Sequence, residues 1–297
     1  MDLKNETFQI RRMRADETDL IREWAAGEGW NPGLHDANCF YATDPQGFFL
    51  GEVDGQPVAM ISCVAYDSSY GFLGLYIVKA AYRGHGYGLR TWQEGMKYLG
   101  TRTVGLDGVL AQQQNYERSG FRFSHHHVRY ERVSGGTPLP ASDFQRRAPR
   151  LEADRARHIV PLSTIPEADL VAYDTARAPA PRPHFLQRWL HLRDSYGFAS
   201  IQDGKLRGFG LVRPCVVGFK IGPLLADDAV VAEDLLRGLL AAAPSGPVFL
   251  DVPDTTPVPR NLALHFGMHE VFRTARMYTR PTSSHEHVFG IASMELG

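Results

Sequence analysis

The chain contains 297 residues, about twice the size of a common domain, so two domains of about 140 residues each are expected. Its 32 Lys and Arg residues against 33 Asp and Glu residues leave a net charge of -1, which argues against a nucleic acid or an anionic membrane surface as the main partner. Three cysteines without Cys-x-x-Cys spacing fit a reducing compartment better than a disulfide framework or a zinc site. The sequence shows neither a signal-peptide pattern nor an apolar run of membrane-spanning length, so we expect a cytoplasmic protein.

The first half alternates short apolar runs of strand type with amphipathic segments. Turns such as Asp54-Gly55 separate the runs and favour hairpins, because both residues tolerate the positive φ of tight turns. In the segment 89–100, an apolar face is expected from Leu89, Trp92, Met96 and Leu99, which recur at helical spacing. The predicted order is strand, helix, three strands, helix, strand, helical turn and strand. These elements cover residues 8–13, 16–29, 48–53, 57–66, 71–78, 89–100, 103–109, 112–120 and 121–131.

Glycine, proline and alternating charges with little apolar periodicity mark residues 134–157 as a linker. A similar order of elements follows it, which predicts a tandem duplication with an N-terminal domain at 1–133 and a C-terminal domain at 158–297. The fold class is therefore expected to be α/β. The second set of elements covers residues 159–163, 166–178, 183–194, a hairpin at 196–215, 218–226, a helix from Asp227, 247–253, 260–268 and 269–279.

The stretch from Tyr76 to Leu89 carries the clearest chemical signal. A predicted strand runs into a loop that contains Gly84, Gly86 and Gly88, and the loop runs into a helix. Glycines remove side chains there, so consecutive backbone N–H groups can converge on phosphate oxygens at the positive end of the helix. A Rossmann fingerprint would need a parallel βαβ unit with an acidic residue about 20 residues further on, and a P-loop would need Gly-Lys-[Ser/Thr]; neither is present. The loop is therefore predicted to be a pyrophosphate cradle.

This loop resembles motif A of the GNAT acetyltransferases, R/Q-x-x-G-x-G/A, and a second stretch, Tyr-Glu-Arg-Ser-Gly-Phe at 116–121, resembles the Tyr-Glu-Lys-x-Gly-Phe element of that family. The resemblance implies two tandem GNAT-like domains, each a mixed, mostly antiparallel sheet flanked by helices. It also implies acetyl-CoA as the cosubstrate and no metal, with Tyr116 as the general acid that protonates the departing thiolate. The residues implied to bind acetyl-CoA are Ile77, Val78, Arg83, Gly84, His85, Gly86, Tyr87 and Gly88.

Two positions depart from the family pattern. Val109 stands where the family commonly carries an asparagine that hydrogen-bonds the cofactor, and the strand position of a glutamate base is apolar here, at about Phe72. Water relays could replace such a base. For Tyr116 the alternative is a core tyrosine that supports the turn after it. The side-chain candidates for the base are Asp67, Glu52 and His125.

Two further stretches keep two interpretations each. The run His125 to His127 suggests a metal site, but only His125 and His127 can share one side of a strand and no third ligand is obvious, so a polar strand face near the substrate cleft is favoured. The stretch Trp30-Asn31-Pro32-Gly33 follows the first predicted helix and is either a wall of the acceptor pocket or a simple helix stop.

The second half lacks a comparable glycine-rich loop. Its counterpart at 220–228 has one glycine, a proline and two carboxylates at the start of a helix, where they would repel phosphate. This half, which ends in FGIASMELG, resembles the C-terminal domain of an uncharacterised bacterial tandem-GNAT family, and a conventional CoA site is not expected in it. Four charged residues either line an acceptor pocket or form structural ion pairs, which is the default: Arg213, Lys220, Asp251 and Arg276.

These features predict an N-acyltransferase that moves an acetyl group from acetyl-CoA to a primary amine. A small-molecule amine is favoured over a protein lysine, because two domains can form a cleft. One alternative is a CoA-responsive ligand-binding or regulatory protein with little turnover, and another is a structural protein with a degenerate loop. The expected partner is thus a small-molecule amine, with neither nucleic acid nor membrane. The oligomeric state is left open, a homodimer included.

Overall fold

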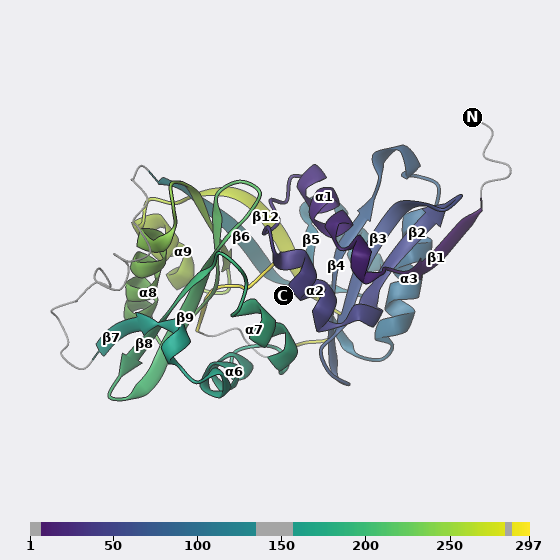
Figure 1. Ribbon diagram of the computed structural model, residues 1–297. Coiled ribbons are helices and arrows are strands. Elements are labelled where there is room, and N and C mark those ends of the chain that lie inside the picture. Colours follow the sequence, from purple (N-terminus) through teal and green to yellow (C-terminus); the bar gives the residue numbers. More distant parts are fainter. Residues whose placement is uncertain (1–6, 135–156, 283–286) are drawn as a thin grey trace.

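The computed structural model of the protein describes residues 7–134, 157–282 and 287–297. Figure 1 shows two lobes side by side, one made mainly of the first half of the chain in purple and blue, the other mainly of the second half in green. The C-terminal end of the chain lies between the lobes. The architecture is α/β, as predicted, and each half combines a mixed sheet with flanking helices.

Each predicted strand and helix has a counterpart in the structure, with shifted ends. The strands are β1 (Phe8–Arg12), β2 (Phe48–Val53), β3 (Gln56–Ala65), β4 (Tyr70–Val78), β5 (Thr103–Val109), β6 (Arg122–Ser134), β7 (Arg157–Pro161), β8 (Tyr196–Gln202), β9 (Lys205–Pro214), β10 (Phe219–Ala226), β11 (Gly246–Pro253), β12 (His269–Tyr278) and β13 (Val288–Gly290). The helices are α1 (Asp19–Gly27), α2 (Asp36–Thr43), α3 (Tyr87–Leu99), α4 (Gln113–Arg118), α6 (Glu167–Thr175), α7 (Pro183–Trp189), α8 (Ala229–Ala242) and α9 (Pro257–His265). None of these helices has the length and apolar character needed to cross a membrane.

The strands of the two halves join in one continuous sheet. Their order is β1-β2-β3-β4-β5-β12-β6-β11-β10-β9-β8-β7, and β13 pairs with β10 beside this path. Strand β12 of the second half lies between β5 and β6 of the first half, and β6 pairs in turn with β11 of the second half. The two halves therefore exchange their last long strands, which are the two that cross the centre of Figure 1.

This exchange bears on the predicted domain boundaries. Ser134 ends β6 and Arg157 begins β7, whereas residues 135–156 of the predicted linker lie outside the described residues. The division of the chain into 1–133 and 158–297 stays a prediction. In space, each lobe includes a strand that the other half of the sequence supplies.

Helices cover both faces of the sheet. The apolar cores on one face each belong mainly to one half of the chain, whereas the core on the other face is shared by both halves. On one face, α3 packs on strands of the first half and α8 and α9 pack on strands of the second, each group with a core of its own. On the other face, α1, α2, α6 and α7 share a single core with strands of both halves, in which Phe40 stacks on Trp189. Met294 and Leu296 of the tail (residues 287–297) also belong to this shared core. The shared core and the exchanged strands make the two halves one packing unit.

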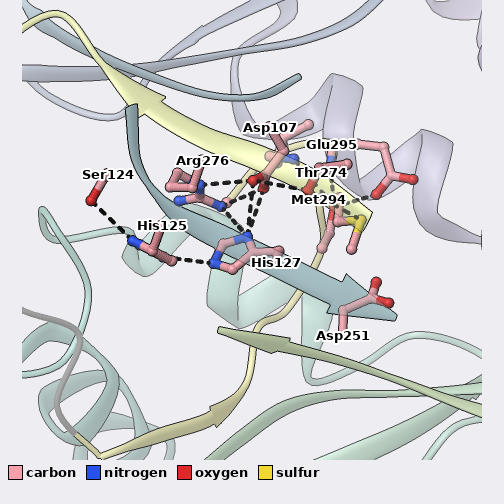
Figure 2. A network of polar contacts seen from close by, with 12 residues as sticks. Asp107, Ser124, His125, His127, Asp251, Thr274, Arg276, Met294 and Glu295 are labelled. Carbon is pink, nitrogen blue, oxygen red and sulfur yellow. Dashed lines mark hydrogen bonds and ion pairs between the residues drawn. The ribbon is translucent and has the colours of Figure 1, made fainter. Parts of the chain in front are cut away.

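A buried polar network fastens the exchanged strands (Figure 2). Asp107 on β5 forms an ion pair with Arg276 on β12, with distances of 2.6 Å from Nη2 to Oδ2 and 3.1 Å from Nε to Oδ1. His127 on β6 places Nδ1 3.0 Å from the same carboxylate, and its Nε2 lies 3.1 Å from Nε2 of His125. Burial by itself raises the pKa of Asp107, but the charges of Arg276 and His127 lower it well below its usual value. The ionised carboxylate therefore links three strands that come from both halves.

The structure differs from the sequence-based prediction in the environment of Leu89 and in an additional helix, α2. Leu89 is 59% exposed, and α3 buries Thr91, Trp92, Gly95 and Leu99. Leu89 lies in the first turn of α3, which lines a cavity and does not cover the sheet. Helix α2 was not predicted, because it has only eight residues and does not separate an apolar from a polar face: the charged residue Asp36 is buried together with Ala37, Cys39 and Phe40.

Replacement of Arg276 by methionine should lower the free energy of unfolding by about 3–5 kcal/mol, because it leaves the Asp107 carboxylate buried without its cation. Chemical denaturation at pH 7 measures this loss. Arg273→Met is the matched control on the same strand, since Arg273 pairs with Glu270 near the surface and its loss should cost less than about 0.5 kcal/mol. Equal losses for the two variants would contradict the role given to the buried pair.

Candidate active site

Strands β4 and β5 run parallel at first and then diverge. They are paired from Tyr70–Thr103 to Leu73–Leu106, although β4 continues to Val78 and β5 to Val109. Leu75 on β4 has a φ of 49°, a left-handed value that interrupts the regular strand just beyond the last pair. A cavity of about 480 Å³ opens here, lined by both strands and by the predicted residues Ile77 and Val78. This part of β4 can therefore bind an extended ligand in place of a neighbouring strand.

The loop after β4 lines the same cavity. Gly84 and Gly86 have φ values of 83° and 80°, which glycine adopts without steric cost, and nothing lies within 4 Å of a Cβ built on either residue. Helix α3 begins at Tyr87, so the loop ends at the positive end of the helix dipole. Within the described part of the chain, no protein acceptor bonds the N–H groups of Gly84, His85, Gly86, Gly88 and Leu89. A row of such donors at a helix start is suited to bind an anion.

Two contacts hold this loop against its surroundings. The Arg83 guanidinium donates to the Val78 carbonyl at 2.8 Å and to the Glu28 carboxylate at 2.5 Å. A Cβ built on Gly88 would lie 2.6 Å from the Tyr76 hydroxyl oxygen and 2.9 Å from Cγ2 of Val78. The Arg83 side chain thus ties the loop to β4 and to the end of α1, and glycine at position 88 allows α3 to start directly against β4.

Tyr116 on α4 lines the cavity together with Val109 and is 8% exposed. Its ring stacks on Trp92 with the centroids 5.6 Å apart, and Gly108 leaves room for it, because a Cβ there would lie 2.3 Å from the ring. Burial raises the pKa of Tyr116 to about 12, with a further contribution from Tyr76. No described residue hydrogen-bonds the Tyr116 hydroxyl, which leaves it able to donate to a ligand in the cavity.

The second half of the chain closes another side of the cavity. Glycine at position 74 lets the tail lie directly on β4, since a Cβ there would be 2.0 Å from the Glu295 carbonyl oxygen. Trp30 lines the cavity with residues of the second half, and its place in a wall of the acceptor pocket stays a prediction. Sequence reasoning missed Glu295, because the tail has neither periodicity nor a motif and only an acid between apolar residues marks it. Four residues of the second half line the cavity: Phe272, Thr274, Met294 and Glu295. Arg129 on β6, the last strand of the first half, lies beside them in the cavity wall.

The three candidates for the general base lie outside this cavity. Asp67 accepts hydrogen bonds from the backbone of the turn that follows it. Glu52 is buried and paired with Arg11 at 2.5 Å. His125 and His127 do face one side of β6, but they bond each other, and His125 lines a different cavity of about 840 Å³. Among the described residues, no group of three or more His, Cys, Asp or Glu side chains is placed to hold a metal ion.

The four charged residues singled out in the second half do not line the cavity. Arg213 pairs with Asp36 at 2.9 Å and Asp251 with Arg129 at 2.6 Å, while Arg276 belongs to the network of Figure 2. Lys220 is buried as well; it donates to the Trp30 carbonyl at 3.3 Å, and burial lowers its pKa. For the three residues in ion pairs, the structural interpretation holds.

The second half repeats the strand divergence but fills it. Strands β10 and β11 pair in parallel only from Phe219–Val248 to Ile221–Leu250, and beyond this point β13 of the tail pairs with β10. At the start of α8, the Asp228 carboxylate accepts hydrogen bonds from the N–H groups of Val230 and Val231, both at 2.9 Å. The strand edge and the anion position are thus taken by groups of the protein itself.

Comparison with known proteins agrees with this geometry. The acetyltransferase (GNAT) family matches residues 10–121, and an acetyltransferase (GNAT) domain matches residues 170–290. The chain is 31% identical over 299 residues to a holothin acyltransferase of Pseudoalteromonas sp. (strain SANK 73390), which covers 99% of this chain and 96% of that protein. It is 24% identical over 260 residues to the uncharacterized N-acetyltransferase YitH of Bacillus subtilis (strain 168), with 85% and 86% covered. The chain therefore belongs to the GNAT acetyltransferase family, whose members take the acyl group from acyl-CoA, and it is an acyltransferase with two tandem GNAT domains.

Solved structures share the fold along the whole chain. A putative acetyltransferase from Pyrococcus horikoshii matches with a TM-score of 0.75 and 21% identity, covering 100% of this chain and 98% of that one. A tandem GNAT protein from the clavulanic acid biosynthesis pathway matches with a TM-score of 0.60 and 13% identity, covering 93% and 100%. The arrangement of two such domains in one chain thus also occurs in other solved structures.

Replacement of Gly88 by alanine should destabilise the protein, because the methyl group would overlap the Tyr76 hydroxyl and Val78. Overpacking of this kind costs about 1–3 kcal/mol, more than the gain of up to about 1 kcal/mol that alanine brings to a helix. Denaturant titration measures the change, and Tyr76→Phe in the same background should recover part of it. Gly27→Ala in α1, where nothing lies within 4 Å of the added Cβ, is the control and should not destabilise. A Gly88→Ala variant as stable as the Gly27→Ala variant would contradict the packing role of Gly88.

Proposed function

We propose that the protein transfers an acetyl group from acetyl-CoA to the primary amine of a small molecule. The observation that carries this proposal is that one cavity of about 480 Å³ combines a diverging strand edge with a row of unbonded loop N–H groups. An extended pantetheine arm needs strand-like backbone partners, and a pyrophosphate needs convergent donors. The cavity offers the two in succession, along β4 and then along the loop that follows it.

The predicted residues divide this task. The backbone of Ile77 and Val78 holds the pantetheine arm, and the loop N–H groups of Gly84, His85, Gly86, Tyr87 and Gly88 surround the pyrophosphate. The N–H group of Arg83, the first residue of the predicted set, already donates to the Ala80 carbonyl at 3.3 Å. Support comes from Gly84 and Gly86, which line the cavity and have positive φ values with open space around them. The Arg83 side chain is already engaged with Val78 and Glu28, so its contribution is to hold the loop in shape.

Tyr116 is the proposed general acid. Its raised pKa keeps the phenol protonated at neutral pH, so that it donates a proton and does not accept one. The amine nitrogen attacks the thioester carbon, the C–S bond breaks, and the Tyr116 hydroxyl passes its proton to the leaving thiolate. The phenolate regains a proton from the nitrogen of the intermediate, which becomes the amide nitrogen of the product.

The acceptor is proposed to enter against the wall that the second half supplies. Trp30 and Phe272 offer apolar surface there, and Thr274 and Glu295 offer polar groups. A cavity walled by both halves admits a small molecule more readily than a lysine on a folded protein. The similarity to an acyltransferase named for holothin supports acyl transfer as the reaction class.

Calorimetric titration with acetyl-CoA should show saturable binding by the wild type. The Gly86→Asp variant should bind at least about tenfold more weakly, because its carboxylate repels the pyrophosphate. Gly55→Asp is the matched control, since Gly55 also has a positive φ, of 78°, and open space around it, but lies in the hairpin turn between β2 and β3. Wild-type protein that fails to bind acetyl-CoA, or equal weakening by both substitutions, would refute the cradle.

Replacement of Tyr116 by phenylalanine should lower kcat by about 100-fold and leave the Kd of acetyl-CoA unchanged, because the ring keeps its stacking on Trp92 while the proton donor is lost. Steady-state kinetics with an amine acceptor and calorimetry measure the two quantities. The control is Tyr98→Phe, since the Tyr98 hydroxyl bonds Asp44 and does not line the cavity. An unchanged kcat would contradict the role of general acid and leave Tyr116 as a core residue only.

A further inference from the structure

The cavity lacks a base on β4 but receives a carboxylate from the tail. Glu295 lines the cavity and is 6% exposed. Its backbone rests on Gly74, one residue beyond Leu73, where the pairing between β4 and β5 ends. Figure 2 shows Glu295 beyond Thr274 and Met294 as seen from Arg276, so it stands apart from the buried ion pair. The tail thus brings an acid to the point where the two strands diverge.

The carboxylates that line this cavity differ in their partners. Glu28 is paired with Arg83 at 2.5 Å, and Asp107 with Arg276 at 2.6 Å. Glu295 accepts a hydrogen bond from the Ser293 hydroxyl at 2.6 Å, and no cationic side chain of the described residues lies within 4.0 Å of it. Glu295 is therefore the lining carboxylate, among the described residues, that can take an ammonium group as its ion-pair partner.

Several charged groups face Glu295 from the surrounding strands, and most are already neutralised. Arg129 on β6 pairs with Asp251, and Arg213 on β9 pairs with Asp36. Burial lowers the pKa of Arg129, but the charge of Asp251, with a further contribution from Glu295, raises it overall. Lys220 on β10 is buried and directed to the Trp30 carbonyl. Burial and Arg129 lower the pKa of Lys220, and the charges of Glu295 and Asp251 offset part of that shift, but no cation among the described residues forms an ion pair with Glu295.

We propose that Glu295 binds the acceptor as an ammonium ion and acts as the general base that deprotonates it, a role that rests on the proposed acetyl transfer. The ammonium nitrogen gives one proton to the Glu295 carboxylate, and the neutral amine attacks the thioester. Its second proton replaces the one that Tyr116 gives to the thiolate. The proton on Glu295 leaves to solvent with the product, so each turnover yields amide, CoA thiol and one proton. The tail of the second half thereby supplies the general base for the reaction in the cavity of the first half.

The test compares Glu295→Gln with the wild type on two kinds of acceptor. An alkylamine has a pKa of about 10, like lysine, and is protonated at pH 7, whereas an arylamine is not. With a panel of primary alkylamines at pH 7, kcat/KM of the variant should fall about 100-fold or more, and the deficit should shrink as the pH rises toward the pKa of the amine. With the matching arylamines the deficit should be small, and the Kd of acetyl-CoA should be unchanged, because glutamine keeps the size of the side chain and an acceptor for Ser293.

The control is Glu52→Gln, which removes a buried carboxylate outside the cavity and should lower stability but leave the pH profile unchanged. A Glu295→Gln deficit that is equal for both kinds of amine and constant with pH would overturn the role of base and leave a structural one. Full activity of Glu295→Gln would overturn it as well. Wild-type protein that binds no acetyl-CoA, or acetylates no amine of the panel, would overturn the proposed function and this inference with it.

Discussion

The ion pair between Asp107 and Arg276 lies where β12 of the second half is inserted between β5 and β6 of the first (Figure 2). Both side chains are almost completely buried, so neither strand can leave without a charge losing its partner in a medium of low dielectric constant. His127 binds the same carboxylate from β6 and extends this constraint to the third strand. The pair thus lies at the strand exchange, which joins the two sheets into one. Phe272 and Thr274, which line the cavity, lie on the strand inserted at this junction.

Both halves contain a parallel pair of strands that diverge, but the space between the strands is used differently in each half. In each, a parallel pair of strands separates after a few residues, at Leu73 in the first half and at Ile221 in the second. The first opening is left to the cavity and is followed by glycines with free N–H groups. The second is filled by β13, and the Asp228 carboxylate binds the N–H groups at the start of α8. One half thus keeps an open cavity, and the other provides a wall and the tail.

Features that depend on neighbouring residues in the chain were predictable from the sequence. The loop with Gly84 and Gly86 was predictable, because a strand, a glycine-rich loop and a helix in succession determine the direction of the backbone N–H groups. Tyr116 was predictable as a lining residue by its resemblance to a family element, whereas its catalytic role stays a proposal. Leu89 was assigned to the wrong environment, because helical spacing shows which residues share a face but not where the sheet beneath that face ends.

The sequence by itself determined the α/β class, the order of strands and helices, the glycine-rich loop between β4 and α3 and the relationship to the GNAT acetyltransferases, since each of these depends on residues close together in the chain. Only the tertiary structure decided that β6 and β12 change places, that Asp251 and Arg276 serve in ion pairs, and that Glu295 reaches the cavity. These features join residues more than 100 positions apart, such as Asp107 and Arg276, or Gly74 and Glu295. The pattern of one segment carries no information about such a partner, because contacts at that distance along the chain are set by the packing of the whole molecule.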